Sequence, residues 1–243
     1  MFKPIIISFA SKGREDYLKM SEKLYLSVKE YWKYDYRFYV MNSNRNEFEG
    51  MQLINISEFP NNSKFKVESH DKIPYQFKLG LIQTAIDDGY THIFWLDSSI
   101  SLNKCPLKLL NQSNKGIMAF HNLGHELKSY ISDNCIEIIN SNIKEVNSAP
   151  KTWGGCFGFD FTKDISKQIF NELIDASLKG AFNESGSNRL EFKAHRHDQS
   201  VMSVLFYRYG IVLYNYGHIL CYNPHCFEPY EYGQYNTFIY GKN

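Results

Sequence analysis

The segment THIFWLDSSISL, at positions 91–102, places a charged residue directly after a short apolar run. Residues 92–96 are mostly aromatic and aliphatic, which is typical of a strand covered on both of its faces. Asp97 follows at once, and the chain becomes apolar again at Ile100. We expect this carboxylate to leave the core at the end of the strand, because the apolar run behind it fixes its position.

Strand and helix patterns alternate through the first hundred residues. Apolar, β-branched or aromatic runs predict strands at 4–9, 36–42 and 92–96 and a short one at 51–56, and apolar residues at helical spacing predict helices at 14–32 and 73–89. Pro74 near the start of the second helix and Gly89 at its end fit the usual asymmetry of helix termini. This alternation predicts an α/β sheet with mainly parallel strands. Ligands of such sheets bind at the carboxyl ends of the strands, where Asp97 is expected.

The second half of the sequence is less regular. We predict strands at 116–120 and 211–216, helices at 163–180 and 197–210, and a partly helical segment at 126–146. A glycine-rich, aromatic segment occupies 152–162, and the region from 217 onward has no clear period. We find no internal repeat and no linker, so 1–243 is expected to form a single domain.

Composition excludes several classes of protein. The chain has 243 residues, 43% of them hydrophobic, and 27 basic residues against 26 acidic ones, so no strong field attracts it to nucleic acid. No apolar stretch has the length of a transmembrane segment or the pattern of a secretory signal. The five cysteines include no CxxC pair, which predicts reduced thiols and a cytoplasmic location. A composition rich in Lys, Asn and Ile suits a bacterium or a large virus, so we expect the cytosol of a bacterium or of a virus's host. Neither GxGxxG nor GxxxxGK[ST] is present, which argues against dinucleotide oxidoreductases and P-loop kinases.

Four stretches together resemble glycosyltransferases of the GT-A fold, the nucleotide-diphospho-sugar transferase superfamily. They are IIISFASKGR, FKLGLIQTAIDDGYTHIFWLDSSI, TWGGCFGF and HDQSV, in that order. The resemblance implies a Rossmann-related, mixed and mainly parallel sheet flanked by helices, with a nucleotide-binding half at 1–100 and a sugar and acceptor half at 101–243 that ends in an aromatic tail. It also implies transfer of a hexosyl or pentosyl group from a nucleotide-diphosphate donor to a hydroxyl of a glycan or another acceptor.

The resemblance further implies a metal site with Mn²⁺ or Mg²⁺ on Asp97. The superfamily's motif has a second acidic residue, whose place is taken here by Ser99. A serine hydroxyl is a poorer ligand for a hard cation than a carboxylate. Asp97 is therefore expected to bind the cation with help from a later histidine, His218 or else His225, or the protein uses less metal or none. The alternative role of Asp97 is to cap a turn.

The remaining donor-site candidates come from three places in the sequence. Ser8 and Lys12 lie at the end of the first strand, and Lys78 lies on the helix that leads to Asp97, spaced to face the nucleotide. A solvated surface lysine is an equally good interpretation of Lys78. In the segment WGGCFGF, the ring of Trp153 can stack on a sugar, and Gly154 and Gly155 allow a close backbone approach. A tight turn with aromatic core residues is the alternative there.

Asp198 is the candidate catalytic residue. Resemblance to inverting members implies that it accepts the acceptor's proton, whereas in retaining members an equivalent aspartate orients the donor sugar. A carboxylate in the first turn of a helix is also favoured by the helix dipole alone, and the two roles are compatible.

Three other interpretations remain open. A structural zinc site would use His218, Cys221, His225 and Cys226, although adjacent His225 and Cys226 fit the usual ligand spacing badly. A nucleotidyltransferase that makes an activated sugar usually has a glycine-rich basic first loop, and ASKGRED has one glycine. A non-catalytic sugar- or nucleotide-binding protein is favoured if Ser99 marks a lost metal site, and donor hydrolysis would separate it from an enzyme.

Overall fold

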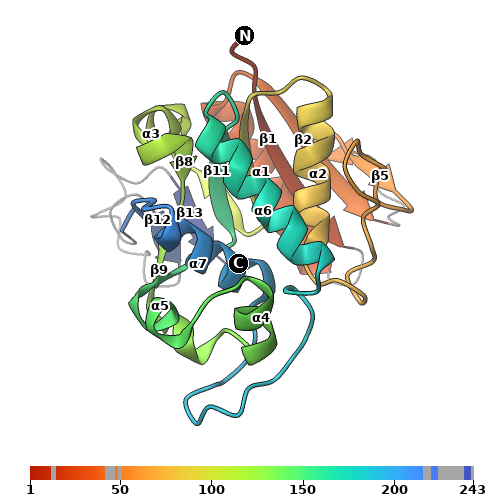
Figure 1. The fold of residues 1–243 in the computed structure, drawn as a ribbon. Helices are drawn as coiled ribbons and strands as arrows, with labels where there is room; N and C mark the ends of the chain where they lie inside the picture. The colour runs from red at the N-terminus through yellow and green to blue at the C-terminus, as the bar shows by residue number, and fades with distance from the viewer. Residues whose placement is uncertain (12–14, 42–46, 49–50, 216–219, 224–237, 242–243) are drawn as a thin grey trace.

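The computed structural model describes residues 1–11, 15–41, 47–48, 51–215, 220–223 and 238–241 (Figure 1). Its strands are β1 (Pro4–Ser11), β2 (Asp35–Met41), β3 (Glu47–Phe48), β4 (Met51–Gln52), β5 (Ile54–Ile56), β6 (His92–Leu96), β7 (Ile100–Leu102), β8 (Ile117–Met118), β9 (His121–Glu126), β10 (Pro150–Thr152), β11 (Cys156–Asp160), β12 (Leu220–Asn223) and β13 (Phe238–Gly241). Its helices are α1 (Glu15–Tyr31), α2 (Gln76–Asp87), α3 (Leu107–Gln112), α4 (Asp133–Ile138), α5 (Ile143–Ser148), α6 (Asp164–Leu178) and α7 (His197–Arg208), with 3₁₀ turns η1 (Asn114–Gly116) and η2 (Leu127–Ser129).

The main sheet has six strands in the order β5-β2-β1-β6-β11-β8. The first four are parallel to one another, and β11 runs antiparallel to both β6 and β8. The predicted mixed, mainly parallel sheet flanked by helices is therefore confirmed. Strand order reverses between β1 and β6, so their carboxyl ends border the crevice in which doubly wound sheets bind ligands.

Side chains of the central strands alternate between two cores. Ile5 and Ile7 of β1 belong to the same buried cluster as residues of α2, α6 and α7, whereas Ile6 belongs to the cluster that contains residues of α1. On β6, Trp95 faces the first cluster and Phe94 the second. Figure 1 shows α2 and α6 side by side across one face of the sheet. This period of two fixes which residues near the strand ends face α2.

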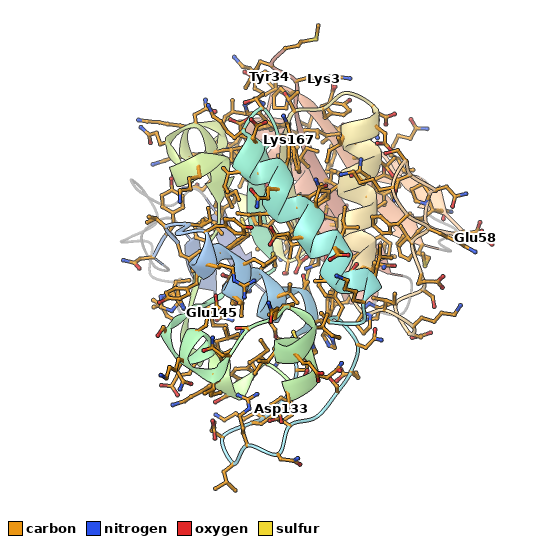
Figure 2. The ribbon with its side chains drawn as sticks, in the orientation of Figure 1. Lys3, Tyr34, Glu58, Asp133, Glu145 and Lys167 are labelled. Atoms are coloured by element: carbon orange, nitrogen blue, oxygen red, sulfur yellow. The ribbon has the colours of Figure 1, made fainter. Side chains whose placement is uncertain are left out.

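Smaller sheets and short helices complete the fold. Strands β12, β13 and β7 form a three-stranded sheet, and β9 pairs with β10. In Figure 2, Lys3 and Tyr34 lie at the opposite end of the molecule from Asp133 and Glu145. Since Lys3 directly precedes β1, the carboxyl end of that strand points toward the half of the molecule that contains α4 and α5.

Several predicted elements differ from those observed: the strand expected at 51–56 is divided into β4 and β5 at Leu53, and the one expected at 116–120 is limited to β8. The helix expected at 73–89 begins at Gln76, because Tyr75 has a left-handed backbone with φ of 61°. The strand predicted at 211–216 is wrong within the described residues 211–215, where Tyr214 forms only a single bridge to Phe120. Val212 is 65% exposed, so this apolar run is not covered as a core strand would be.

The segment 126–146 is helical in part, as predicted, and its breaks have local causes. The Ser132 hydroxyl accepts the Cys135 N–H at the start of α4, and the Asn142 side chain accepts the N–H groups of Lys144 and Glu145 at the start of α5. These caps divide the segment into short helices. Over the described ranges, every helix falls short of the combined length and apolarity needed to cross a bilayer.

Candidate functional site

A cavity of about 830 Å³ lies at the carboxyl ends of β1 and β6. Phe9 of β1 and residues of the segment 57–72 line one part of it. Lys78, Asp97 and Trp153 line another part. Cavities of about 300–1,000 Å³ are typical of small-molecule and cofactor sites. Its volume and its place at the reversal of strand order make it the candidate ligand site.

Asp97 is held rigidly at the edge of this cavity. Its backbone N–H donates to the Gly155 carbonyl at 2.8 Å, and its own carbonyl accepts the Ile100 N–H at 2.9 Å, which closes the turn after β6. The indole N–H of Trp95 donates to Oδ1 at 2.7 Å. The side chain is 39% exposed. The turn is thus closed by main-chain atoms, and the carboxylate lines the cavity instead of capping a backbone group.

Lys78 lies in the first turn of α2, and its ammonium group is buried between two carboxylates. Nζ donates to the Gly154 carbonyl at 2.7 Å, and it lies 3.3 Å from Asp97 Oδ1 and 3.3 Å from Asp198 Oδ2. Burial by itself lowers the pKa of Lys78, but Asp198 and Asp97 outweigh it and raise the pKa above its ordinary value. Lys78 is therefore a fixed positive charge at the cavity wall and not a solvated surface lysine.

Asp198 is the second residue of α7 and is 3% exposed. Within the described part of the chain, neither of its carboxylate oxygens has a hydrogen-bond partner, although Lys78 forms an ion pair with Oδ2. Burial raises the pKa of Asp198, and the Lys78 ammonium opposes that effect. Buried carboxylate oxygens are nearly always hydrogen-bonded, so this group has capacity for a hydroxyl or a water molecule.

Gly154 and Gly155 allow the close approach of these charged groups. A Cβ on Gly154 would lie 2.6 Å from Gln199 Cγ and 3.2 Å from Asp198 Oδ2. A Cβ on Gly155 would lie 2.7 Å from the Trp153 indole and 3.1 Å from Asp97 Oδ2. Real Cβ atoms essentially never lie within 3.0 Å of another heavy atom, so Gly154 makes room for Gln199 and Gly155 for the Trp153 ring, while the two carboxylates would be in tight contact.

Aromatic rings surround the ammonium of Lys78. Nζ lies 5.1 Å from the centre of the Tyr75 ring and 5.5 Å from that of Trp95. Tyr75 in turn packs edge-on against His70 at 4.9 Å and lies 5.3 Å from His197. The His197 imidazole is anchored by a 2.7 Å hydrogen bond from Nδ1 to the Phe182 carbonyl. Cation–π contacts of this kind stabilise a desolvated ammonium.

The end of the cavity at β1 is apolar. Phe59 stacks on Phe77 at 5.5 Å with an interplanar angle of 9°, and Phe9 lies 4.7 Å from Phe77. Phe9, Phe59 and Phe77 all line the cavity. Flat rings bind well against such surfaces. The cavity wall thus offers a cluster of rings that suits a planar aromatic group, in addition to the charged groups around Lys78.

The predicted site residues fall into four groups. Lys78, Asp97, Ser99 and Trp153 line the cavity, and Asp198, Gly154 and Gly155 lie in the wall behind it. Ser8 is fully buried on the face of β1 opposite to Phe9, and Phe9 is the residue of that strand that lines the cavity. Lys12, His218 and the spare ligand His225 lie outside the described residues.

Sequence reasoning missed Phe9, His70, Tyr75 and Gln199, which also line the cavity. Gln199 follows directly on Asp198 and was the easiest of these to find. Tyr75 follows Pro74 ahead of α2, and an aromatic residue between a proline and a helix carries no functional signal of its own. Phe9 could have been found from the alternation along β1, once the face covered by α2 was known.

The described residues offer a divalent cation few ligands. The Trp95 indole donates to Asp97 Oδ1 and the Lys78 ammonium lies 3.3 Å from the same oxygen, so Oδ2 is the more available ligand; Ser99 also lines the cavity. The described ranges contain no group of three or more His, Cys, Asp or Glu side chains that could hold a metal ion. Mg²⁺ and Mn²⁺ often take one carboxylate together with substrate phosphates and water. This donor set therefore fits such a cation only jointly with a bound diphosphate.

The zinc hypothesis falls mostly outside the described residues. Only Cys221, on β12, lies within them, and its side chain is not described. The hypothesis stays untested.

No protein-family model and no curated protein matches this chain. Its function must therefore be inferred from the geometry of the site.

Proposed function

We propose that this protein is a GT-A-type glycosyltransferase that moves a sugar from a nucleotide-diphosphate donor to a hydroxyl of a glycan or another acceptor. The observation that carries the proposal is the ion triad of Asp97, Lys78 and Asp198 at the wall of a cavity between β1 and β6. A buried cation beside a cavity with an apolar end fits a ligand that joins a planar base to a diphosphate. The four sequence stretches of the resemblance all contribute residues to this region.

The charged groups have distinct roles in the proposed reaction. The acceptor oxygen forms a bond to the anomeric carbon of the sugar, while the bond from that carbon to the diphosphate oxygen breaks. The electron pair of the broken bond leaves with the nucleoside diphosphate, whose negative charge the Lys78 ammonium stabilises. The acceptor's proton passes to Asp198, whose raised pKa suits a general base. Gln199, the next residue of α7, also lies against Gly154 and lines the cavity.

Asp97 orients this arrangement and is the candidate ligand of a divalent cation. When such a cation is bound together with the donor, it supplies further positive charge for the departing diphosphate. Lys78 lies at the same place, but Asp97 and Asp198 already balance its charge, so Lys78 and such a cation would act on the diphosphate together. Trp153, which also lines the cavity, offers an aromatic face for the sugar.

Thermal denaturation against nucleoside diphosphates and nucleotide sugars, with and without Mn²⁺, tests the proposal. A ligand that binds the native state raises the melting temperature by mass action. We expect one nucleotide to raise it and Asp97→Asn to weaken that response. A response that requires Mn²⁺ would assign the cation to Asp97, and a response without metal would leave Lys78 as the charge that acts on the diphosphate. Absence of any response to the whole panel would reject the proposal.

Donor turnover separates an enzyme from a binding protein. We expect slow hydrolysis of the matching nucleotide sugar by the wild-type protein and its loss in Asp198→Asn, with nucleotide binding retained. Nuclear magnetic resonance of the released sugar then shows which anomer forms first. Inversion would support Asp198 as the base, and retention would assign it to the donor sugar. Binding without any turnover, with or without acceptors, would favour a non-catalytic sugar- or nucleotide-binding protein.

A further inference from the structure

A second cluster of charged residues, formed by Lys151 and Arg196 around Tyr130, adjoins the site through Gln199. Lys151, on β10, is 3% exposed, and its Nζ donates to Gln199 Oε1 at 3.3 Å. The same ammonium lies 4.9 Å from the centre of the Tyr130 ring. The guanidinium carbon of Arg196, the residue before α7, lies 5.6 Å from the centre of that ring. Two cations thus share one aromatic ring.

Hydrogen bonds fix the backbone segments that carry Tyr130, Lys151 and Arg196. The Tyr130 carbonyl accepts the Arg196 N–H at 3.1 Å and the Ser200 hydroxyl at 2.6 Å. The Lys193 N–H donates to the Ser129 carbonyl at 2.9 Å, and His125 Nδ1 lies 3.1 Å from the Tyr130 hydroxyl. On β10, the Thr152 N–H donates to the Ser203 hydroxyl of α7 at 2.8 Å. Lys151, Arg196 and Tyr130 are therefore held in place by backbone contacts.

These cations have no ion-pair partner among the described residues. No carboxylate of the described ranges lies within the 4.0 Å ion-pair distance of Lys151, Lys193 or Arg196. Burial and the neighbouring Arg196 lower the pKa of Lys151 to about 8, while Asp198 acts in the opposite direction. A buried ammonium beside a second cation is costly unless an anion joins them. The cluster thus has the chemistry of an anion-binding site.

The position of the cluster relates it to the proposed reaction. Gln199 lines the cavity and also accepts the hydrogen bond from Lys151, so the two regions share one side chain. If the base of the donor occupies the Phe9 end and the diphosphate lies at Lys78, the sugar reaches Trp153 and Gln199. The acceptor then approaches from beyond Gln199, where Lys151 and Arg196 lie.

We propose that Lys151, Arg196 and Tyr130 form an anion subsite that binds a carboxylate or phosphate group of the acceptor. This assignment to the acceptor rests on the proposed glycosyltransferase function. Charge-assisted hydrogen bonds from an ammonium and a guanidinium are the usual means of holding such groups. The preferred acceptors are accordingly acidic or phosphorylated glycans, and neutral glycans bind more weakly.

Melting temperatures of the full chain test the subsite with inorganic phosphate and with glucuronate as probes, and with glucose as the neutral control. The titrations are made at constant ionic strength and with a saturating nucleoside diphosphate, so that the donor cavity does not contribute. We expect phosphate and glucuronate, but not glucose, to raise the melting temperature saturably. Lys151→Met and Arg196→Gln should each weaken this response by about tenfold, as the loss of one charge-assisted contact predicts. Lys167→Gln, which changes an exposed lysine near the opposite end of the molecule (Figure 2), should leave it unchanged.

The outcomes separate the subsite from the proposed function. An equal response of all variants to phosphate and glucuronate, or no response of the wild-type protein, overturns the subsite even if nucleotides bind. A response that depends on Lys151 and Arg196 supports the subsite even if no nucleotide binds, and the missing nucleotide response then rejects the glycosyltransferase instead. Arg196 is exposed, so Arg196→Gln remains informative if Lys151→Met fails to fold.

Discussion

The rings of Tyr75 and His197 lie 5.3 Å apart, and both residues have positive φ angles, 61° and 43°. Tyr75 immediately precedes α2, and His197 is the first residue of α7. A non-glycine residue in this conformation costs about 1–3 kcal/mol and persists only where the surroundings hold it. The two strained residues are thus in contact at the start of α2, which carries Lys78, and at the start of α7, which carries Asp198.

Replacement of Tyr75 tests this strained junction. Tyr75→Val places a β-branched side chain at positive φ and removes the ring contacts with His70, His197 and Lys78. We expect it to lower the free energy of unfolding by about 2–4 kcal/mol, as cavity formation and backbone strain combine. Tyr75→Phe keeps the ring and serves as the control, with an expected change below about 1 kcal/mol. Urea denaturation measures both, and equal losses would contradict the interpretation.

Removal of the buried ammonium should destabilise the protein strongly. Lys78→Met leaves Asp198 buried without its counter-charge, and breaking such a pair costs about 3–5 kcal/mol. Without Lys78 the pKa of Asp198 rises further, so the folded state binds a proton that the unfolded state releases. The loss should therefore be smaller at pH 5 than at pH 8. Asp198→Asn added to Lys78→Met should recover part of the stability, and strictly additive losses in this double-mutant cycle would disprove the coupling.

The buried Lys151 predicts a pH dependence of stability. Its pKa is about 8 when folded and 10.5 ordinarily, so between these values the unfolded chain binds more protons than the folded one. Stability should then rise as the pH increases from about 8 to 10.5, because the cost of burying the charge disappears. Arg196, Lys193, His125, Tyr130 and Asp198 are the charged or titratable groups around it.

Lys151→Met isolates this contribution. The variant should lack the rise between pH 8 and 10.5 that the wild-type protein shows in urea denaturation. Lys78, with its raised pKa, has the opposite effect and lowers stability only above its ordinary value of 10.5. Parallel curves for the wild-type protein and the variant would show that Lys151 is not buried as a charged group.

Gly80 of α2 lies against Val67, which belongs to the part of the cavity wall formed by the segment before α2. A Cβ on Gly80 would lie 2.2 Å from Val67 Cγ2, and the stiff valine side chain cannot yield by that amount. Gly80→Ala should cost about 1–3 kcal/mol by overpacking and should weaken ligand binding, because Val67 lines the cavity. Val67→Ala in the same chain should restore most of the loss. Gly186→Ala is the matched control, since a Cβ there meets no atom within 4 Å, and it should be neutral.

Local pattern was enough to place Asp97 but not its partners. The apolar run 92–96 and its abrupt end predicted a buried strand with a carboxylate at its carboxyl end, and β6 confirms that placement. The helix before it was predicted too, with Lys78 on it. The ion pair of Lys78 with Asp198 joins residues far apart in sequence, and no periodicity encodes such a contact.

Other features could not be predicted because they depend on tertiary contacts. Lys151 lies in a short segment, PKTW, and its sequence neighbours give no sign that a lysine there is buried. The side chain is buried because β10 packs against α7. Ser8 was selected from its position at the end of a strand, but side-chain alternation turns it to the opposite face from Phe9. A one-residue difference in that alternation separates a cavity residue from a buried hydroxyl.

All six strands of the main sheet lie between residues 4 and 160, whereas Asp198 enters with α7. A chain emerging from the ribosome can therefore pair its whole central sheet while Lys78 still has only one of its two counter-charges. The incomplete site is a local instability that docking of α7, the last helix of the described residues, removes. Nascent chains truncated before and after α7 should differ in protease resistance at α2, although the sheet itself is complete in both.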